Sequence, residues 1–200
     1  MKILLNNQML YEAIGSLNSV GFVPTMGGIH KGHISLINKS KKVCKKTLVS
    51  IFINPKQFNN KDDFKNYPSN INKDLLLLKK IKKVDFVYIP EFNEIYKSKR
   101  KSEIILKKKD KILCAKFRKG HFEGVLDVMD RLTKLIKPNK IFMGKKDYQQ
   151  LYLVKRFIEK KYKTRIIACN TIRAKNKYAL SSRNFLLKNI KLDKAGKIAK

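Results

Sequence analysis

The sequence has few cysteines and no long apolar run. Three cysteines occur in 200 residues, at Cys44, Cys114 and Cys169, and they are odd in number and far apart. This spacing argues against a disulfide framework or a zinc site and fits a reducing cytoplasm. No apolar stretch approaches the roughly 20 residues that a membrane-spanning helix needs. The opening Met-Lys-Ile-Leu-Leu-Asn-Asn-Gln turns polar too soon for a signal peptide, and it predicts a short strand.

Acidic residues are also scarce. Fifteen Asp and Glu oppose 47 Lys and Arg, which leaves a formal net charge of +32. Such a charge invites a nucleic-acid interpretation. However, Lys outnumbers Arg 40 to 7, and Lys, Ile and Asn, which share A/T-rich codons, make up 78 of the 200 residues. A phosphate-binding face should cluster and use Arg for bidentate contacts. The densest lysine runs, at 39–46, 79–83 and 97–111, instead fall at predicted helix ends and loops.

Apolar segments alternate with segments of helical period along the chain. The pattern predicts strands at 20–25, 47–53, 84–89, 140–143 and 164–169, with an extra strand at 104–106. It predicts helices at 31–43, 71–81, 122–136 and 148–161. Strands that are apolar throughout and alternate with helices indicate an α/β fold with a doubly wound parallel sheet covered on both faces. Ligands of such sheets bind at the carboxyl ends of the strands.

Two of the three histidines lie in one short motif after the first predicted long strand. Residues 23–33 read Val-Pro-Thr-Met-Gly-Gly-Ile-His-Lys-Gly-His and end with His30 and His33. A glycine turn at a helix start offers free backbone N–H groups and a partial positive charge, which favour phosphate. The histidines can donate to phosphoryl oxygens as negative charge develops. The alternative interpretation is a turn with two surface histidines.

Polar groups follow three other predicted elements. Asn54 and Gln57, after the strand at 47–53, can supply amide groups to a small polar substrate. After the strand at 140–143, Gly144 allows close approach of a nucleotide, Lys146 can neutralise phosphate, and Asp147 is a candidate helix cap. The segment 179–183, Ala-Leu-Ser-Ser-Arg, suits a polyphosphate. The third histidine, His121, starts the helix at 122–136, where a structural role is the commoner one.

These blocks, taken in order, closely resemble the pantothenate synthetase (pantoate–β-alanine ligase) family of the nucleotidyltransferase superfamily. The resemblance runs from about residue 3 to residue 187. Its blocks are Pro24–His33, Val49–Pro55 with Gln57 and Phe58, Gly120–Phe122 with Gly124 and Val125, and Gly144 with Lys146, Asp147, Gln149 and Gln150, followed by Ala179–Arg183. A cytidylyltransferase shares the His-x-Gly-His signature but not the Asn-Pro-x-Gln-Phe and Gly-x-Lys-Asp-x-Gln-Gln blocks.

The resemblance implies a Rossmann-like fold and ATP-dependent joining of pantoate to β-alanine with Mg²⁺. The pantoate carboxylate attacks the α-phosphate of ATP, which gives pantoyl adenylate and pyrophosphate. The β-alanine amine then attacks the activated carbonyl and releases AMP. The implied protein is a cytoplasmic homodimer with no specific nucleic-acid or membrane partner.

The resemblance also implies a role for each matching residue. His33 is the proton donor, His30 contacts the phosphates, and Lys146 neutralises the α-phosphate. Gln57 and Gln150 bind pantoate, Gln57 also lies near β-alanine, and Asn54 belongs to the same substrate site. Asp74 matches an acidic position associated with Mg²⁺. The residues implied to bind ATP are Met26, Gly27, Gly28, Ile29, His30, Lys31, Gly32, His33, Gly144, Lys145, Lys146, Asp147, Ile172, Leu180, Ser181, Ser182 and Arg183.

The chain also departs from the family pattern. Lys56 replaces the usual Met, Ser69 replaces the usual Arg, and Leu113-Cys114-Ala115 stands for Leu-Glu-Gly. We expect residues 1–170 to form the nucleotide- and pantoate-binding domain, and 171–200 to hold a phosphate-binding loop and the start of the family's C-terminal lid. A shortened lid predicts weaker ATP binding and leakage of the adenylate to water. The alternatives are a weakly active or inactive remnant and a polycationic nucleic-acid-binding protein.

Overall fold

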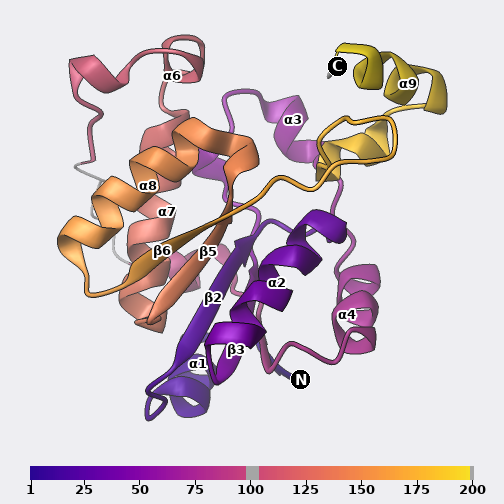
Figure 1. Ribbon diagram of the computed structural model, residues 1–200. Helices are drawn as coiled ribbons and strands as arrows, with labels where there is room; N and C mark the ends of the chain where they lie inside the picture. Colours follow the sequence, from indigo (N-terminus) through magenta and orange to yellow (C-terminus); the bar gives the residue numbers. More distant parts are fainter. Residues whose placement is uncertain (98–103, 199–200) are drawn as a thin grey trace.

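The computed structural model describes residues 1–97 and 104–198 and contains one parallel sheet (Figure 1). Its strands are β1 (Lys2–Leu4), β2 (Val20–Thr25), β3 (Lys46–Ile51), β4 (Phe86–Tyr88), β5 (Lys140–Gly144) and β6 (Arg165–Cys169). They lie in the order β1-β4-β3-β2-β5-β6, and each neighbouring pair is parallel. The predicted α/β class and doubly wound parallel sheet are confirmed.

Helices cover both faces of this sheet. The apolar residues of α1, α7 and α8 join one buried cluster, and those of α2 and α4 join a second on the opposite face. The helices are α1 (Asn7–Ile14), α2 (Lys31–Val43), α3 (Lys61–Lys65), α4 (Ile71–Lys80), α5 (Phe92–Ile95), α6 (Cys114–Phe117), α7 (His121–Ile136), α8 (Tyr148–Lys161) and α9 (Asn189–Ile198), with 3₁₀ turns η1 (Pro55–Gln57), η2 (Lys108–Asp110), η3 (Lys145–Asp147) and η4 (Ser182–Leu186).

The inner strands divide their side chains between the two clusters. Phe22 of β2 and Leu48 of β3 belong to the cluster under α7 and α8, while their neighbours Val23 and Val49 belong to the cluster under α2 and α4. Successive side chains of a strand point to opposite faces, so a strand buried on both faces must be apolar throughout. This explains why β2 and β3 show no alternation of polar and apolar residues.

Successive strands are added on one side of β2 and then on the other, although all of them are parallel. From β2 the chain proceeds through α2 to β3 and then to β4, whereas β5 and β6 lie on the other side of β2. The loops after β2 and β5 therefore diverge at neighbouring strand ends. Such a switch point leaves a crevice at the carboxyl edge of the sheet, and this is where ligands of the fold bind.

The structure confirms most predicted elements and corrects others. Helices α2 and α8 have the predicted bounds, and the predicted strand at the N-terminus is β1. The strand expected at 104–106 is wrong: Leu106 is buried, but the segment joins no ladder. Ile104 and Leu106 pack a loop against the core, and two apolar residues this close together give the same short sequence pattern as a strand. Helices α1 and α9 were not predicted.

The segment after β6 returns to the carboxyl edge of the sheet. Arg173 and Ala179 form an isolated antiparallel bridge, and η4 follows. Ser181 caps η4 in a reciprocal pair with Asn184. The buried Ser182 hydroxyl donates to a carbonyl oxygen of the loop after β2, as described below, so this segment is docked against the sheet edge.

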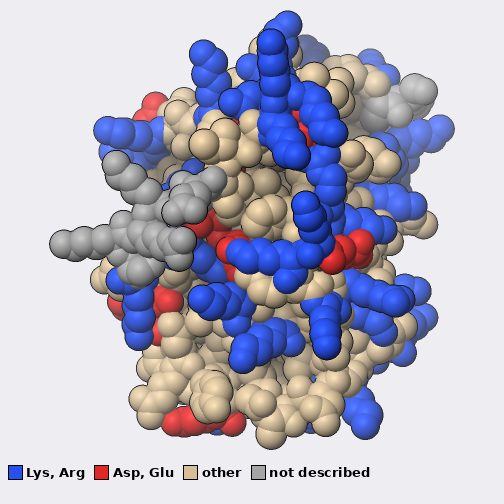
Figure 2. All heavy atoms as spheres, turned by 90° about the vertical axis from the view of Figure 1, so that its left-hand side faces the viewer, with Lys and Arg blue, Asp and Glu red and all other residues tan. Residues whose placement is uncertain are grey.

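Basic side chains are spread over the surface. Figure 2 shows Lys and Arg scattered with other residues between them, not gathered into one stripe, on the side of the molecule that carries α6, α7 and α8. The lysine run at 39–46 spans the end of α2 and the start of β3, and the run at 79–83 begins in the last turn of α4 and continues past its end. Of the run at 97–111, residues 98–103 lie outside the described residues. Among the described helices, none is long and apolar enough to cross a membrane.

Helix α4 offers a matched test of the core. Leu78 is 0% exposed and Leu76 is 69% exposed. We expect Leu78→Ala to lower the free energy of unfolding by about 2–5 kcal/mol, because it removes buried area and leaves a cavity. Leu76→Ala should change it by no more than about 0.5 kcal/mol. Urea denaturation of both variants measures the difference, and equal losses would contradict the packing of α4.

Candidate active site

A cavity of about 250 Å³ lies at the carboxyl ends of β2, β3 and β5. Most of the site residues predicted from the sequence meet there, although they come from four separate segments. Those in the lining are Met26, His30, Gly32, His33, Asn54, Gln57, Gly144, Lys146, Asp147, Gln150, Ile172, Leu180, Ser181, Ser182 and Arg183. Gly27, Gly28, Ile29, Lys31, Lys145 and Asp74 are not part of the lining.

The glycine turn after β2 is tightly enclosed. Gly27 has φ +81° and Gly28 has φ +62°, values that residues with a side chain rarely adopt. A Cβ on Gly27 would lie 2.2 Å from the Ser69 Oγ, and one on Gly28 would lie 2.4 Å from the Pro68 carbonyl oxygen. Both the backbone conformation and the space therefore require glycine at these two positions.

Asp74 of α4 holds this turn. Its Oδ2 accepts the Gly28 N–H at 2.8 Å, and its Oδ1 accepts the Ile29 N–H at 2.7 Å. From the other side, the Ser182 Oγ lies 3.0 Å from the Gly28 carbonyl oxygen. The buried Asp74 carboxylate is thus fixed by two charge-assisted hydrogen bonds, which account for it without a metal.

The backbone N–H groups of the turn are not free for phosphate, which corrects the expectation from the sequence. Five of them donate within the protein. The pairs are Gly27 to Thr25 Oγ1, Gly28 and Ile29 to Asp74, His30 to His33 Nδ1, and Gly32 to His30 Nδ1. The start of α2 instead presents the imidazole rings, which cap the helix reciprocally.

Both rings are arranged as neutral donors. The rings of His30 and His33 lie with their centroids 4.1 Å apart and their planes tilted by 35°, and each uses Nδ1 to accept a backbone N–H. The proton of each neutral ring is therefore on Nε2. Burial, reinforced by the charge of Lys146, lowers the pKa of His30 to about 4. Burial, with His30 and Lys146 as smaller causes, lowers the pKa of His33 to about 3. Neither ring carries a charge near pH 7.

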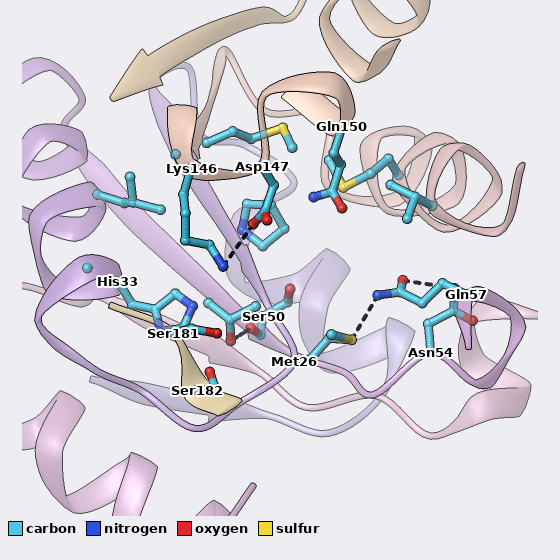
Figure 3. A pocket seen from close by; sticks show the side chains of 18 of the residues that line it. Met26, His33, Ser50, Asn54, Gln57, Lys146, Asp147, Gln150, Ser181 and Ser182 are labelled. Atoms are coloured by element: carbon cyan, nitrogen blue, oxygen red, sulfur yellow. Dashed lines mark hydrogen bonds and ion pairs between the residues drawn. The ribbon is translucent and has the colours of Figure 1, made fainter. Parts of the chain in front are cut away.

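The charges at this end of the cavity come from Lys146 and Arg183. Figure 3 shows Lys146 and Asp147 on the side of the cavity opposite His33, with the Lys146 ammonium pointing inward. The Lys146 Nζ lies 3.3 Å from an Asp147 oxygen. Asp147 stands at the cap position of α8, but its side chain makes no cap hydrogen bond. Its predicted capping role is therefore wrong, and it serves as the partner of Lys146.

Arg183 is held by a carboxylate in the same way. Its Nε and one terminal nitrogen donate to the two oxygens of Asp63 on α3, at 3.2 and 2.8 Å. Its guanidinium carbon also lies 5.3 Å from the centroid of the Tyr67 ring. Each of the two cations predicted to face phosphate is thus already paired with an aspartate.

Amide groups form the other end of the cavity (Figure 3). The Gln57 Nε2 lies 2.9 Å from the Met26 Sδ, a weak acceptor, and Gln150 faces the same space. Asn54 lines the cavity but has no hydrogen-bonding capacity left: its oxygen accepts from Lys56 N and Tyr96 OH, and its NH₂ group donates to Gln57 Oε1 and Gly124 O. The geometry gives Asn54 a structural role.

Other lining groups were not assigned a role from the sequence. The His121 Nδ1 lies 2.6 Å from the Gln57 carbonyl oxygen, and burial lowers the pKa of His121. Arg118 faces the cavity, and burial lowers the pKa of its guanidinium. The buried Ser50 Oγ has no hydrogen-bond partner among the described residues. An apolar wall comes from Val125, Val128, Met129 and Leu132 of α7. The sequence offered one signal that Ser50 belongs to the site, which is its position as a polar residue inside an apolar strand.

Comparison with known proteins identifies the family. The model of the family described as pantoate-beta-alanine ligase matches residues 3–200. The chain belongs to the pantoate–β-alanine ligase family. The ligase of Buchnera aphidicola subsp. Acyrthosiphon pisum (strain 5A), a pantothenate synthetase, is 44% identical over 191 residues, which cover 92% of this chain and 67% of that protein. The pantothenate synthetase of Pseudothermotoga lettingae is 41% identical over 170 residues, 84% of this chain and 60% of that protein.

Crystal structures of the ligase family have the same fold. The pantoate-beta-alanine ligase from Francisella tularensis, complexed with beta-gamma ATP and beta-alanine, matches with a TM-score of 0.94 and 39% identity, over 100% of this chain and 78% of that one. Pantothenate synthetase from Thermus thermophilus matches with a TM-score of 0.94 and 31% identity, over 100% and 72%. This chain spans 60% and 67% of the lengths of the P. lettingae and Buchnera proteins.

The two interpretations of Asp74 predict different behaviour. If Asp74 holds the glycine turn, Asp74→Asn should lower the free energy of unfolding by about 1.5–3 kcal/mol without any metal, because an NH₂ group then faces a backbone N–H. Thermal denaturation with and without Mg²⁺ measures this. Asp62→Asn, at an exposed position, is the control. A loss of stability that appears only with Mg²⁺ would support the metal role instead.

Proposed function

We propose that this protein condenses pantoate with β-alanine to pantothenate, consuming ATP and releasing AMP and pyrophosphate through a pantoyl-adenylate intermediate. The observation that carries the proposal is one cavity with two chemically different ends, built from all four blocks of the family pattern. Imidazole and cationic groups lie at one end and neutral amides at the other. A carboxylate is a poor electrophile, and adenylation supplies it with a leaving group.

The first end is suited to ATP. Neutral His30 and His33 offer Nε2–H groups that can donate hydrogen bonds to the phosphates. The role of proton donor that the resemblance implies for His33 requires a protonated ring and stays a prediction. Lys146 stabilises the charge that develops on the α-phosphate, because a preorganised cation in a partly dry site needs no solvent reorganisation. Gly144, whose Cβ position has no atom nearer than 3.9 Å, leaves room for the nucleoside, and Ile172 lines the same cavity.

The second end is suited to pantoate. Pantoate carries a carboxylate, two hydroxyl groups and two methyl groups on one carbon. Gln57 and Gln150 can donate to its oxygens, and the apolar wall of α7 can cover its methyl groups. Asn54 acts by positioning Gln57. Exclusion of water by this wall also protects the mixed anhydride from hydrolysis.

Mg²⁺ is expected to enter with the ATP phosphates. Among the described residues, no group of three His, Cys, Asp or Glu side chains could hold a metal ion. Asp63, Asp74 and Asp147 are each engaged with a cation or with amides. Magnesium bound through substrate phosphates needs only one or two carboxylates and otherwise water. The assignment of Asp74 to Mg²⁺ stays a prediction that the Asp74→Asn experiment tests.

Other assignments also stay predictions. These are the division into a nucleotide- and pantoate-binding domain at 1–170 and a phosphate-binding segment from 171, the homodimer, and the cytoplasmic location. The face in Figure 2 gives no support to the nucleic-acid alternative, because Lys and Arg are scattered over it. Polyanion binding without ATP turnover would favour the nucleic-acid alternative.

Product formation tests the function directly. With Mg-ATP, pantoate and β-alanine, we expect AMP and pantothenate in equal amounts. Lys146→Ala should lower kcat/KM about 10²–10³-fold, because it removes charge stabilisation in the transition state. Lys155→Ala, on the exposed side of α8, is the control and should leave it unchanged. AMP from pantoate alone would indicate that the adenylate forms and reaches water, and no AMP with either mixture would refute the proposal.

The pair between Asp63 and Arg183 gives a second test. ATP must draw Arg183 away from Asp63 if Arg183 binds its phosphates. A partly exposed ion pair of this kind is worth about 0.2–1 kcal/mol, so Asp63→Asn should lower KM for ATP by about 1.4- to 5-fold. Asp62→Asn removes the same charge from an exposed neighbour and should have less effect. A raised KM for ATP in Asp63→Asn would instead show that Asp63 helps to place Arg183.

A further inference from the structure

Tyr96 lies behind the amide end of the cavity and is not part of its lining. It follows α5 directly and is 8% exposed. Its hydroxyl lies 3.0 Å from the Asn54 Oδ1 and donates to it. Burial, and next the nearby charge of Asp127, raise the pKa of Tyr96, so the hydroxyl keeps its proton.

This hydroxyl defines how the Asn54 amide is turned. The Asn54 oxygen accepts from Tyr96 OH and from the Lys56 N–H at 3.2 Å. Its NH₂ group must then lie on the other side, where it donates to Gln57 Oε1 at 3.3 Å and to the Gly124 carbonyl at 3.2 Å. The Asn54 amide thus has two donors facing its oxygen and two acceptors facing its NH₂ group. If the amide were turned over, its NH₂ group would face the Lys56 N–H and its oxygen would face the two acceptors.

The orientation of the Asn54 amide in turn fixes the orientation of the Gln57 amide. Because the Gln57 oxygen is the acceptor for Asn54, the Gln57 NH₂ group is the part that points to the cavity, as Figure 3 shows. Among the described residues, its one hydrogen-bond partner there is the Met26 sulfur, at 2.9 Å. A donor that rests on a weak acceptor favours a ligand oxygen in its place. The cavity therefore presents N–H, not C=O, at this point.

The Tyr96 ring is held from several directions. The Lys56 Nζ lies 4.0 Å and the Arg131 guanidinium carbon 4.6 Å from the ring centroid. Phe92 stacks on the ring with centroids 4.6 Å apart. Asp127 balances the cations, with its oxygens 2.8 Å from the Arg131 Nε and 3.9 Å from the Lys56 Nζ. Lys56, one of the residues that depart from the family pattern, thus takes part in fixing Tyr96.

We propose that Tyr96 is a positioning residue that orients the Gln57 amide through Asn54, so that an N–H donor faces an oxygen of the acid substrate. The proposal rests on the proposed function of the cavity. The proposal predicts selectivity at the substrate atom that faces the Gln57 N–H. A hydroxyl or carboxylate oxygen there can accept a hydrogen bond and is favoured, whereas a group that can only donate is rejected.

Tyr96→Phe removes the hydroxyl and keeps the ring. We expect KM for pantoate to rise about 2- to 10-fold, the worth of one hydrogen bond, while KM for ATP stays within about 2-fold. Tyr88→Phe is the matched control: its buried hydroxyl donates to Asn7 at 2.6 Å, and Tyr88 is not part of the cavity lining. It should leave both KM values unchanged. Equal changes in the two KM values, or an unchanged KM for pantoate, would overturn the proposal.

A measurement without turnover separates this proposal from the proposed function. The side-chain amide signals of Gln57 in ¹⁵N-labelled protein can be assigned by their loss in Gln57→Ala. They should move in Tyr96→Phe and stay in place in Tyr88→Phe. If the signals move but the wild-type protein forms no AMP, the positioning role stands and the proposed reaction fails. If AMP forms but the signals stay in place, the reaction stands and the role of Tyr96 fails.

Discussion

The arrangement of the cavity depends on one carboxylate that takes two backbone N–H groups. Asp74 fixes the Gly28–Ile29 peptide of the turn after β2, and this turn places His30 at the start of α2. Once these amides are occupied, the loop can no longer bind an anion through its backbone in the manner of a phosphate-binding glycine loop. The donors that remain at this end of the cavity are the Nε2–H groups of the two rings together with the cations Lys146 and Arg183. Asp74 thus limits which groups the loop after β2 presents to the cavity.

The cations at the cavity are also engaged by partners within the protein. Lys146 is paired with Asp147, and Arg183 with Asp63, although the chain carries 47 basic and only 15 acidic residues. Each pair keeps a flexible cation near the cavity when no anion is present. Because these pairs are partly exposed, they are weak and can be exchanged for phosphate. Surface lysines away from the cavity also pair with carboxylates, as Lys41 does with Asp85 and Lys161 with Asp130, and Figure 2 shows the basic residues of one face spread among other residues.

The sequence predicted the long elements because their signals are physical constraints on burial. A strand buried on both faces, such as β2, must be apolar, and a helix such as α7 must have one apolar side. Short elements gave no such signal: α1 contributes only Leu10 and Ile14 to the core, and Leu106 anchors a loop that resembled a strand. The residues of the site were also predictable, since their types and order were distinctive.

What each site residue does was less predictable, because function depends on which way an amide or ring is turned. Nothing in the order of residues shows that Asn54 uses its whole amide inside the protein, or that the rings of His30 and His33 cap the helix with Nδ1. These assignments depend on partners distant in the chain. Tyr96 is 42 residues from Asn54, and Asp74 is 46 residues from Gly28.

The contact between Ser182 and Gly28 joins residues that are 154 positions apart. A chain synthesised from its N-terminus makes the histidine motif early and all six strands before Ser182 appears. Domains generally fold as units, so the carbonyl groups of the glycine turn gain this partner only once the segment that carries Ser182 has been made. The histidine end of the cavity is therefore completed late in synthesis, although the motif that marks it is among the first parts made.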